Sequence, residues 1–232
     1  GEILHCNYNS FHRVGYLQEQ PMIGGDLATR YPLRMVAGIL HDTVGIEDWL
    51  MSYSDCFPHG KTEVETILSQ LKRGSAPKTT SCGRVLDAVS AILGLCYERT
   101  YEGEPAMKLE SAATLGKDAL NLTPNLGGNV LDTTSLIQEI FSQRNRHSVT
   151  DLAYSAQSYL AKGLAQLAMQ EAERLGVKVI GFSGGVAYNE HITQTIQEAV
   201  EKNGFIFVVH EHLPPSDGGI SFGQAVAASL SA

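Results

Sequence analysis

Apolar residues recur at helical spacing through much of the chain, every third or fourth position along a run. The longest run predicts a single helix from Asp151 to Leu175, which Gly176 would end. Its apolar face consists of Leu152, Ala156, Leu160, Leu164 and Leu167. A run of this length is typical of a helix with one buried face.

Shorter helices are predicted in the middle of the chain, at about 34–40, 62–71, 85–93, 105–115 and 136–141. Thr62 followed by Glu65 predicts a capping box at the start of the second of these helices. Gly74 would close the same helix, because glycine readily adopts the left-handed conformation of a helix C-terminus.

The last quarter of the chain alternates short apolar runs with a helix. Residues 177–182 and 205–209 are rich in β-branched and aromatic residues, which predicts two buried strands. Between them, apolar residues four apart from Ile192 to Val200 predict a helix. Strand, helix, strand in this order predicts a βαβ unit with parallel strands.

The predicted elements indicate an α/β fold. The chain has 232 residues and 43% hydrophobic content, which suffices for a substantial buried core. We interpret it as one α/β domain with a helical insertion at about 42–147 and an α/β lobe at about 150–232.

Composition narrows the functional classes. The net charge of −8 arises from 17 basic and 25 acidic residues, which disfavours binding to a nucleic-acid backbone. We find no apolar run of about 18 residues and no secretory leader, and we infer a cytoplasmic protein. The four cysteines show no CxxC spacing and are interpreted as reduced, structural thiols.

Ser183-Gly184-Gly185 lies where a predicted strand meets a helix. Glycines there allow backbone N–H groups to approach a phosphate or ribose, so the turn is a candidate nucleotide site. A purely geometric turn is the alternative, since the glycine spacing matches neither common nucleotide-binding motif. Asn189 could read a purine or ribose, or could simply cap the helix.

Residues 210–219 follow the second predicted strand, at the sheet edge where α/β proteins bind ligands. Asp217, before two glycines, could ligate a metal or a metal-bridged phosphate, and a turn aspartate is the alternative. His210 and His212 would lie on opposite faces of a continuing strand and could not easily share one metal. We interpret both histidines as surface or supporting residues.

Two further candidates lie earlier in the chain. Gly24 and Gly25 belong to a predicted turn at 21–25, and they could face the later glycine turn across a bound nucleoside. Arg84 and Asp87 could contact a phosphate, but a surface ion pair is favoured. No Ser-His-Asp or HExxH pattern is evident, so the catalytic residues stay unknown.

Three parts of the sequence resemble the C-terminal, universal-tRNA-modifier-like domain of HypF-type hydrogenase maturation carbamoyltransferases. They are Arg13–Leu17 through Gly24–Asp26, Ser81–Val89 through Tyr101–Gly103, and Phe182–Val186 through Leu213–Gln224. The last is the most specific, since it combines Gly-Gly-Val-x-x-Asn with LPPxDGGIxxGQ. The resemblance covers nearly the whole chain and implies the C-terminal part of a longer enzyme.

The resemblance implies an actin/sugar-kinase/Hsp70-like (RNase H-like) fold with a nucleotide between two lobes. Family members use ATP and carbamoyl phosphate to make carbamoyl adenylate, then carbamoylate the C-terminal cysteine of HypE for cyanide-ligand synthesis. The resemblance assigns nucleotide contacts to Gly24, Gly25, Ser183, Gly184, Gly185 and Asn189. It assigns Asp217 to a divalent metal, which could be zinc, iron or magnesium.

The family's carbamoyl-adenylate-forming domain and its His-x-x-x-His metal pair are not found in this sequence. We therefore expect an incomplete metal site, weak nucleotide binding and no turnover by this chain alone. A related tRNA threonylcarbamoyl transferase-like lobe is one alternative, although the acidic charge does not favour tRNA. A non-catalytic interaction module is the other main alternative, and a sugar or acetate kinase is a more remote one.

Overall fold

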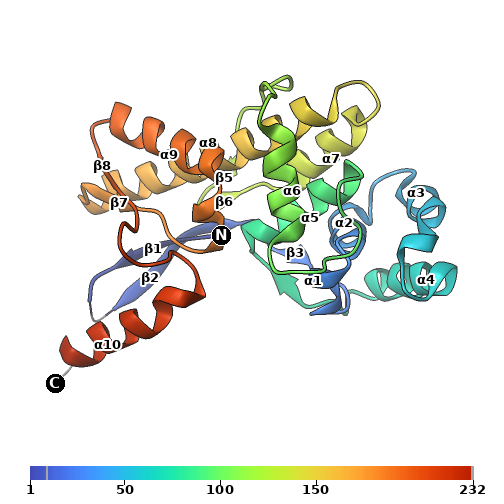
Figure 1. The fold of residues 1–232 in the computed structure, drawn as a ribbon, viewed down its shortest axis with the longest axis horizontal. Coiled ribbons are helices and arrows are strands. Elements are labelled where there is room, and N and C mark those ends of the chain that lie inside the picture. The colour runs from blue at the N-terminus through green and yellow to red at the C-terminus, as the bar shows by residue number, and fades with distance from the viewer. Residues whose placement is uncertain (9, 231–232) are drawn as a thin grey trace. The chain divides into compact units, whose positions relative to one another are not determined.

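A computed structural model describes residues 1–8 and 10–230 of the chain (Figure 1). The chain divides into two compact units. Unit 1 comprises Gly1–Leu17, Thr123–Leu131 and Ser158–Ala232, and unit 2 comprises Gln18–Leu122 and Asp132–Gln157. The predicted helical insertion falls mostly within the ranges of unit 2, and its boundaries stay a prediction.

Unit 2 is built mainly from helices. They are α1 (Leu27–Arg30), α2 (Leu33–Leu40), α3 (Ile46–Ser52), η1 (Ser54–Cys56), α4 (Gly60–Lys72), α5 (Cys82–Ile92), α6 (Glu104–Ala113) and α7 (Thr134–Gln143). Strands β3 (Gln20–Pro21) and β4 (Lys78–Thr79) form a short antiparallel pair. Every residue of α2 is buried, because α2 packs against other helices and β3, and helix α5 is buried nearly as completely. The predicted helices of this region are confirmed.

The predicted capping box of α4 is wrong. The helix begins at Gly60, so Thr62 and Glu65 lie inside it rather than at its boundary. Glu63 takes the capping role instead, since its Oε2 accepts the N–H of His59 at 3.0 Å. Gly74 follows the helix with φ +67°, as predicted.

Unit 1 contains a mixed sheet in the order β1-β2-β6-β5. Its strands are β1 (Glu2–Cys6), β2 (Phe11–Leu17), β5 (Leu126–Gly127) and β6 (Val130–Leu131). The sheet packs closely on α8 (Val149–Leu175), where a Cβ added to Gly163 would lie 2.5 Å from a Leu131 side-chain carbon. The predicted long helix is confirmed, and the division between the units falls within it.

The predicted βαβ unit is also confirmed. Strand β7 (Val179–Gly181) pairs in parallel with β8 (Ile206–Val208), and α9 (Glu190–Lys202) connects them. The prediction that both strands are buried is wrong, since Val179 is 49% exposed and Ile206 is 58% exposed. This sheet has only two strands within the described residues, and α9 packs against β8. Much of the sheet surface therefore faces solvent.

A last helix, α10 (Ile220–Leu230), follows the short η3 (Asp217–Gly219). Across residues 1–8 and 10–230, no helix combines the length and the apolar content needed to cross a membrane.

Candidate functional site

The Ser183–Gly185 turn leaves β7 and enters η2 (Gly185–Tyr188). Gly184 has φ +96°, a conformation that favours glycine strongly over any residue with a side chain. Its N–H donates to the carbonyl oxygen of Pro215 at 2.7 Å. That N–H therefore serves the fold, and ligand binding through this turn would have to use neighbouring groups.

Further hydrogen bonds join the turn to residues 210–216. The Ser183 hydroxyl donates to Pro215 O at 3.2 Å, and its Oγ lies 2.9 Å from His210 Nε2. Tyr188 Oη lies 3.4 Å from Ser216 Oγ. The structure thus brings the two candidate motifs of unit 1 onto one surface. The Ser183–His210 contact could not be predicted from the sequence pattern.

Gly185 and Asn189 differ in accessibility. Gly185 is exposed, and a Cβ added there would meet no atom within 4 Å. Asn189 is buried, and its Oδ1 accepts the N–H of Ile192 at 2.8 Å, which caps α9. The capping interpretation of Asn189 is confirmed, while its contact with a nucleotide stays a prediction.

Asp217 is exposed and begins η3, close in sequence to the hydrogen-bonded loop. Within the described residues, no group of three or more His, Cys, Asp or Glu side chains is arranged to hold a metal ion. One carboxylate in water is too weak a donor set for a transition metal. Metal ligation by Asp217 therefore stays a prediction.

The second glycine turn lies in unit 2. Gly24 and Gly25 have φ +85° and +57°, so the predicted turn is confirmed. Beneath it lies Arg34, which donates to Ile23 O at 3.3 Å and forms a buried ion pair with Glu63. Because the two turns belong to different units, a shared ligand stays a prediction.

Arg34 was missed in the sequence, although a signal for it existed. It is the charged residue in an otherwise apolar helix of eight residues, and a buried guanidinium requires partners. Its Nη1 would lie 2.4 Å from a Cβ added to Gly24, so this side chain fills the space under the turn.

Arg84 and Asp87 form an ion pair of 2.9 Å, but the prediction of a surface location is wrong. The Asp87 side chain is fully buried, because α5 lies between neighbouring helices. Burial raises the pKa of Asp87 to about 6, against the opposing effect of Arg84 and Arg99. Apart from the Arg84 ion pair, neither carboxylate oxygen has a hydrogen-bond partner among the described residues.

The cysteines are free thiols. Cys82 and Cys96 are buried, as expected for structural thiols, and burial raises the pKa of Cys82 to about 11. The same prediction is wrong for Cys6, which is exposed on β1.

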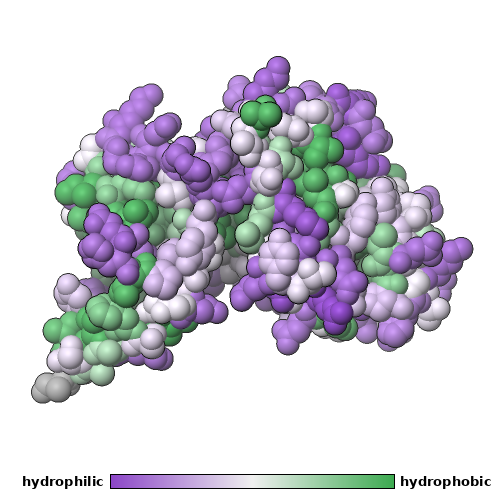
Figure 2. All heavy atoms as spheres, in the orientation of Figure 1, coloured by the Kyte–Doolittle hydropathy of each residue, from purple (hydrophilic) through white to green (hydrophobic). Residues whose placement is uncertain are grey.

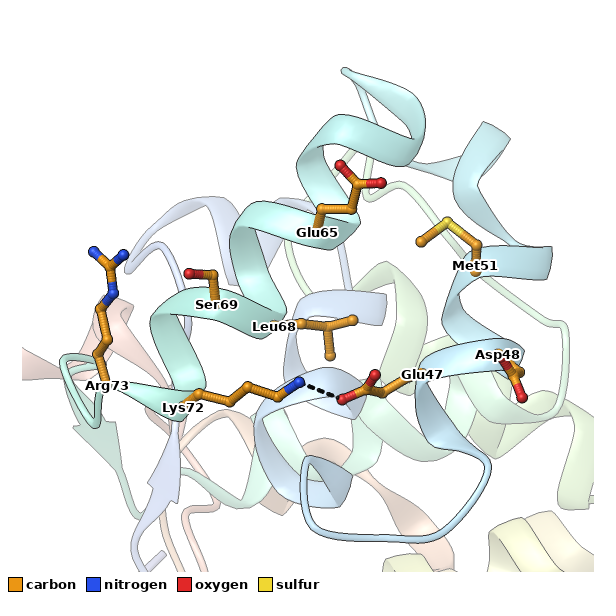
Figure 3. Close-up of a pocket in the computed structure, with 8 residues that line it drawn as sticks. All are labelled: Glu47, Asp48, Met51, Glu65, Leu68, Ser69, Lys72 and Arg73. Atoms are coloured by element: carbon orange, nitrogen blue, oxygen red, sulfur yellow. Dashed lines mark ion pairs between the residues drawn. The ribbon is translucent and has the colours of Figure 1, made fainter.

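A groove of about 480 Å³ lies between α3 and α4 (Figure 3). Leu68 and Met51 contribute apolar surface, and Lys72 pairs with Glu47 at 2.8 Å. None of the predicted site residues lines it. The groove therefore has no part in the candidate site.

Comparisons with known proteins match HypF carbamoyltransferases over nearly the whole chain and a tRNA threonylcarbamoyltransferase over about half of it. The family model described as "Carbamoyltransferase, Kae1-like Domain, second subdomain" matches residues 1–224. The probable carbamoyltransferase HypF of Methanocaldococcus jannaschii is 42% identical over 98% of this chain and 30% of its own length. A tRNA N6-adenosine threonylcarbamoyltransferase of Nanoarchaeum equitans is 27% identical over 54% of this chain and 38% of its own.

Two solved structures match essentially the whole chain. The T. kodakarensis HypF structure gives a TM-score of 0.90 at 37% identity, covering 100% of this chain and 31% of that one. Full-length HypF "in the phosphate- and nucleotide-bound form" gives 0.87 at 25% identity, covering 99% and 30%. These matches confirm the predicted actin/Hsp70-like fold class.

The chain spans about 30% of the length of the HypF proteins named above. Since the family match extends over residues 1–224, the chain belongs to the carbamoyltransferase family, as the second subdomain of a HypF-type Kae1-like domain.

Proposed function

We propose that this chain is the nucleotide-binding part of a carbamoyltransferase that acts in NiFe hydrogenase maturation. The whole enzyme would use ATP and carbamoyl phosphate, through carbamoyl adenylate, to carbamoylate the C-terminal cysteine of a HypE-type protein. The observation that carries the proposal is the similarity over 99% of the chain to a HypF structure named as phosphate- and nucleotide-bound.

The local geometry supports a nucleotide site around the Ser183–Gly185 turn. Gly185 is exposed and has open space on its Cα, so a ligand can approach the backbone closely. Gly184 is held by Pro215, which fixes the turn before any ligand arrives. A fixed turn lowers the entropy cost of binding.

Gly185→Val tests this site directly. Gly185 does not have a positive φ, so its backbone conformation is open to residues with a side chain. A Cβ at this position would meet no atom within 4 Å, so the variant should fold. The added isopropyl group would occupy the space of the nucleotide. We expect ATP binding, measured by isothermal titration calorimetry, to be lost in this variant.

Gly127→Val is the matched control. Gly127 lies in β5 of the same unit, has equally open surroundings and also lacks a positive φ. It should bind ATP as the wild-type chain does. Equal binding by Gly185→Val and wild type would refute the proposed site.

Catalysis belongs to the longer enzyme in this proposal. We expect the 232-residue chain to show no carbamoyl transfer to a HypE-type acceptor in a radiolabelled carbamoyl phosphate assay, because the adenylate-forming domain is supplied upstream. Turnover by the chain alone would contradict this division of labour.

A tRNA threonylcarbamoyl transferase-like function is the second candidate, supported by the Nanoarchaeum equitans similarity over 54% of the chain. The net charge of −8 argues against a tRNA substrate. Supplying the full-length enzyme with either tRNA or a HypE-type protein would separate the two acceptors. A non-catalytic module would bind no adenosine nucleotide at all.

A further inference from the structure

His210 follows the end of β8 and reaches back to the glycine turn. Its Nε2 lies 2.9 Å from Ser183 Oγ, across 27 residues of sequence. Ser183 Oγ also lies 3.2 Å from Pro215 O, which accepts the Gly184 N–H at 2.7 Å as well. Four groups of the loop and turn are thus joined, namely the His210 ring, the Ser183 hydroxyl, the Pro215 carbonyl and the Gly184 N–H.

The protons in this arrangement can be counted. Pro215 O only accepts, so the single Ser183 proton is the one available for that contact. Ser183 Oγ can then only accept from His210, which requires a proton on Nε2. With the Ser183 proton on Pro215 O, the imidazole would donate to Ser183, and the serine would not be prepared as a nucleophile by a histidine base.

We propose that His210 is a positioning residue for the nucleotide site. By donating from Nε2 to Ser183, it directs the Ser183 proton to Pro215 and holds the turn against the loop that carries Asp217. The proposal rests on the proposed function for its effect on ligand binding. The hydrogen-bond arrangement itself is a property of the unliganded chain.

Pro214 and Pro215 transmit the effect of the Ser183–Pro215 hydrogen bond along the loop. The two rings restrict the loop, so fixing Pro215 O fixes the path into Ser216 and Asp217. Tyr188 and Ser216, 3.4 Å apart, add a second contact between the same segments. His210 thereby couples the two motifs that the resemblance assigns separately to nucleotide and metal.

The first test is spectroscopic and needs no ligand. Long-range ¹H–¹⁵N NMR of the 232-residue chain should show His210 protonated on Nε2, with ring resonances that shift in Ser183→Ala. His212 should not respond to that substitution. A proton found on Nδ1 alone, with Nε2 bare, would overturn the proposal.

The second test measures ATP affinity. His210→Ala should weaken binding about three- to tenfold, the size expected for losing one hydrogen bond. His210→Gln should restore much of the loss, because its amide nitrogen donates from a similar reach. His212→Ala, the matched control two residues away, should bind as wild type does.

The two tests separate the proposals. If the wild-type chain binds no ATP, the proposed function fails, whereas the NMR result still decides the role of His210. A further check is Ser183→Ala with His210→Ala, which should bind ATP no more weakly than Ser183→Ala alone. If the two substitutions lowered ATP affinity independently, the coupling would be refuted. Hydrogen exchange at the Gly184 amide offers another check, because faster exchange in His212→Ala than in His210→Ala would also refute it.

Discussion

Gly24 illustrates how one residue sets a turn. It has φ +85°, and a Cβ there would lie 2.4 Å from Arg34 Nη1. Arg34 cannot retreat easily, since it is buried and paired with Glu63. Neighbouring Gly25 also has positive φ, at +57°, but its Cβ would meet open space.

Alanine substitutions at these two glycines should therefore differ. Gly25→Ala should lower the free energy of unfolding by about 1 kcal/mol, the cost of a left-handed alanine. Gly24→Ala should lower it by about 2–4 kcal/mol, because the clash adds to that cost. Urea denaturation of both variants measures the difference, and equal losses would mean that Arg34 does not occupy the space beneath the turn.

The raised pKa of Asp87 should make the stability of the fold depend on pH. Burial raises its folded pKa to about 6 from an ordinary value of 3.8. A raised pKa means that the folded state binds the proton more tightly, so this contribution to stability is present below about pH 4 and is lost as pH rises through 6.

Asp87→Asn should remove this dependence. The variant should gain about 2 kcal/mol relative to wild type between pH 4 and pH 7, following the conversion of pKa shift to free energy. Denaturation of both proteins across this range measures the gain. Parallel pH profiles for the two proteins would show that the Asp87 carboxyl titrates normally in the fold.

At the scale of elements, helices were predictable where one face is buried. The spacing of apolar residues from Leu152 to Leu167 fixes the face of α8 that packs inward, and all five of its predicted apolar residues are buried. Helix boundaries were less predictable. Several polar residues near the start of α4 could cap it, and the sequence pattern favoured Thr62, whereas Glu63 accepts the N–H of His59 and the helix begins at Gly60. Strand burial was not predictable either, because a β-branched run shows a strand but not what covers it.

The candidate site divides in the same way. Glycine turns at 24–25 and 183–185 could be located, because their residues carry a local conformational preference. The contact of His210 with the second turn could not be predicted, since it joins segments distant in sequence. Arg34 stood out as the charged residue of an apolar helix, but its place beneath the first turn was not evident from that pattern. Contacts of that kind depend on the assembled fold.

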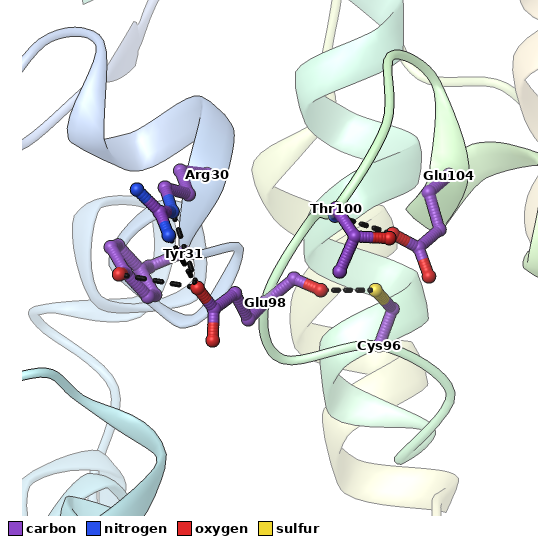
Figure 4. A network of polar contacts seen from close by, with 6 residues as sticks. All are labelled: Arg30, Tyr31, Cys96, Glu98, Thr100 and Glu104. Atoms are coloured by element: carbon purple, nitrogen blue, oxygen red, sulfur yellow. Dashed lines mark hydrogen bonds and ion pairs between the residues drawn. The ribbon is translucent and has the colours of Figure 1, made fainter.

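Polar contacts hold the segment between α5 and α6, and the Glu104 carboxylate makes several of them (Figure 4). Glu104 accepts the Thr100 N–H at 2.6 Å and the Thr100 hydroxyl at 2.8 Å, and it pairs with Lys108 at 2.8 Å. Lys108 and the Thr100 donors lower the pKa of Glu104 to about 2. The loop before α6 is thereby tied to the first turn of that helix.

Glu104→Gln should change how the stability of the fold falls at acid pH. A lowered pKa contributes stability above about pH 4.5, which is lost as pH falls towards 2. The glutamine variant should be less stable than wild type at neutral pH and should lose less on acidification. Glu102→Gln, in the same loop and without a resolved contact to Thr100, serves as the control in thermal unfolding at each pH.

Across the whole molecule, apolar burial is unevenly distributed. Helix α2 of unit 2 is buried along its entire length, whereas α10 of unit 1 buries no residue within the described part of the chain. Ile220 and Phe222 are each 55% exposed, and Figure 2 shows hydrophobic surface over α10 at the lower left. Since burial supplies most folding free energy, α10 should contribute little to the stability of this chain.

Ending the chain after Gly219 tests that expectation. An 11-residue helix without buried contacts is marginal in water, so its removal should change the free energy of unfolding by less than about 0.5 kcal/mol. Urea denaturation measures the change, and hydrogen exchange on the intact chain should show α10 amides exchanging much faster than those of α2. A loss above about 1 kcal/mol, or equal protection of the two helices, would mean that α10 packs against the chain in solution and that its apolar face is occupied rather than open.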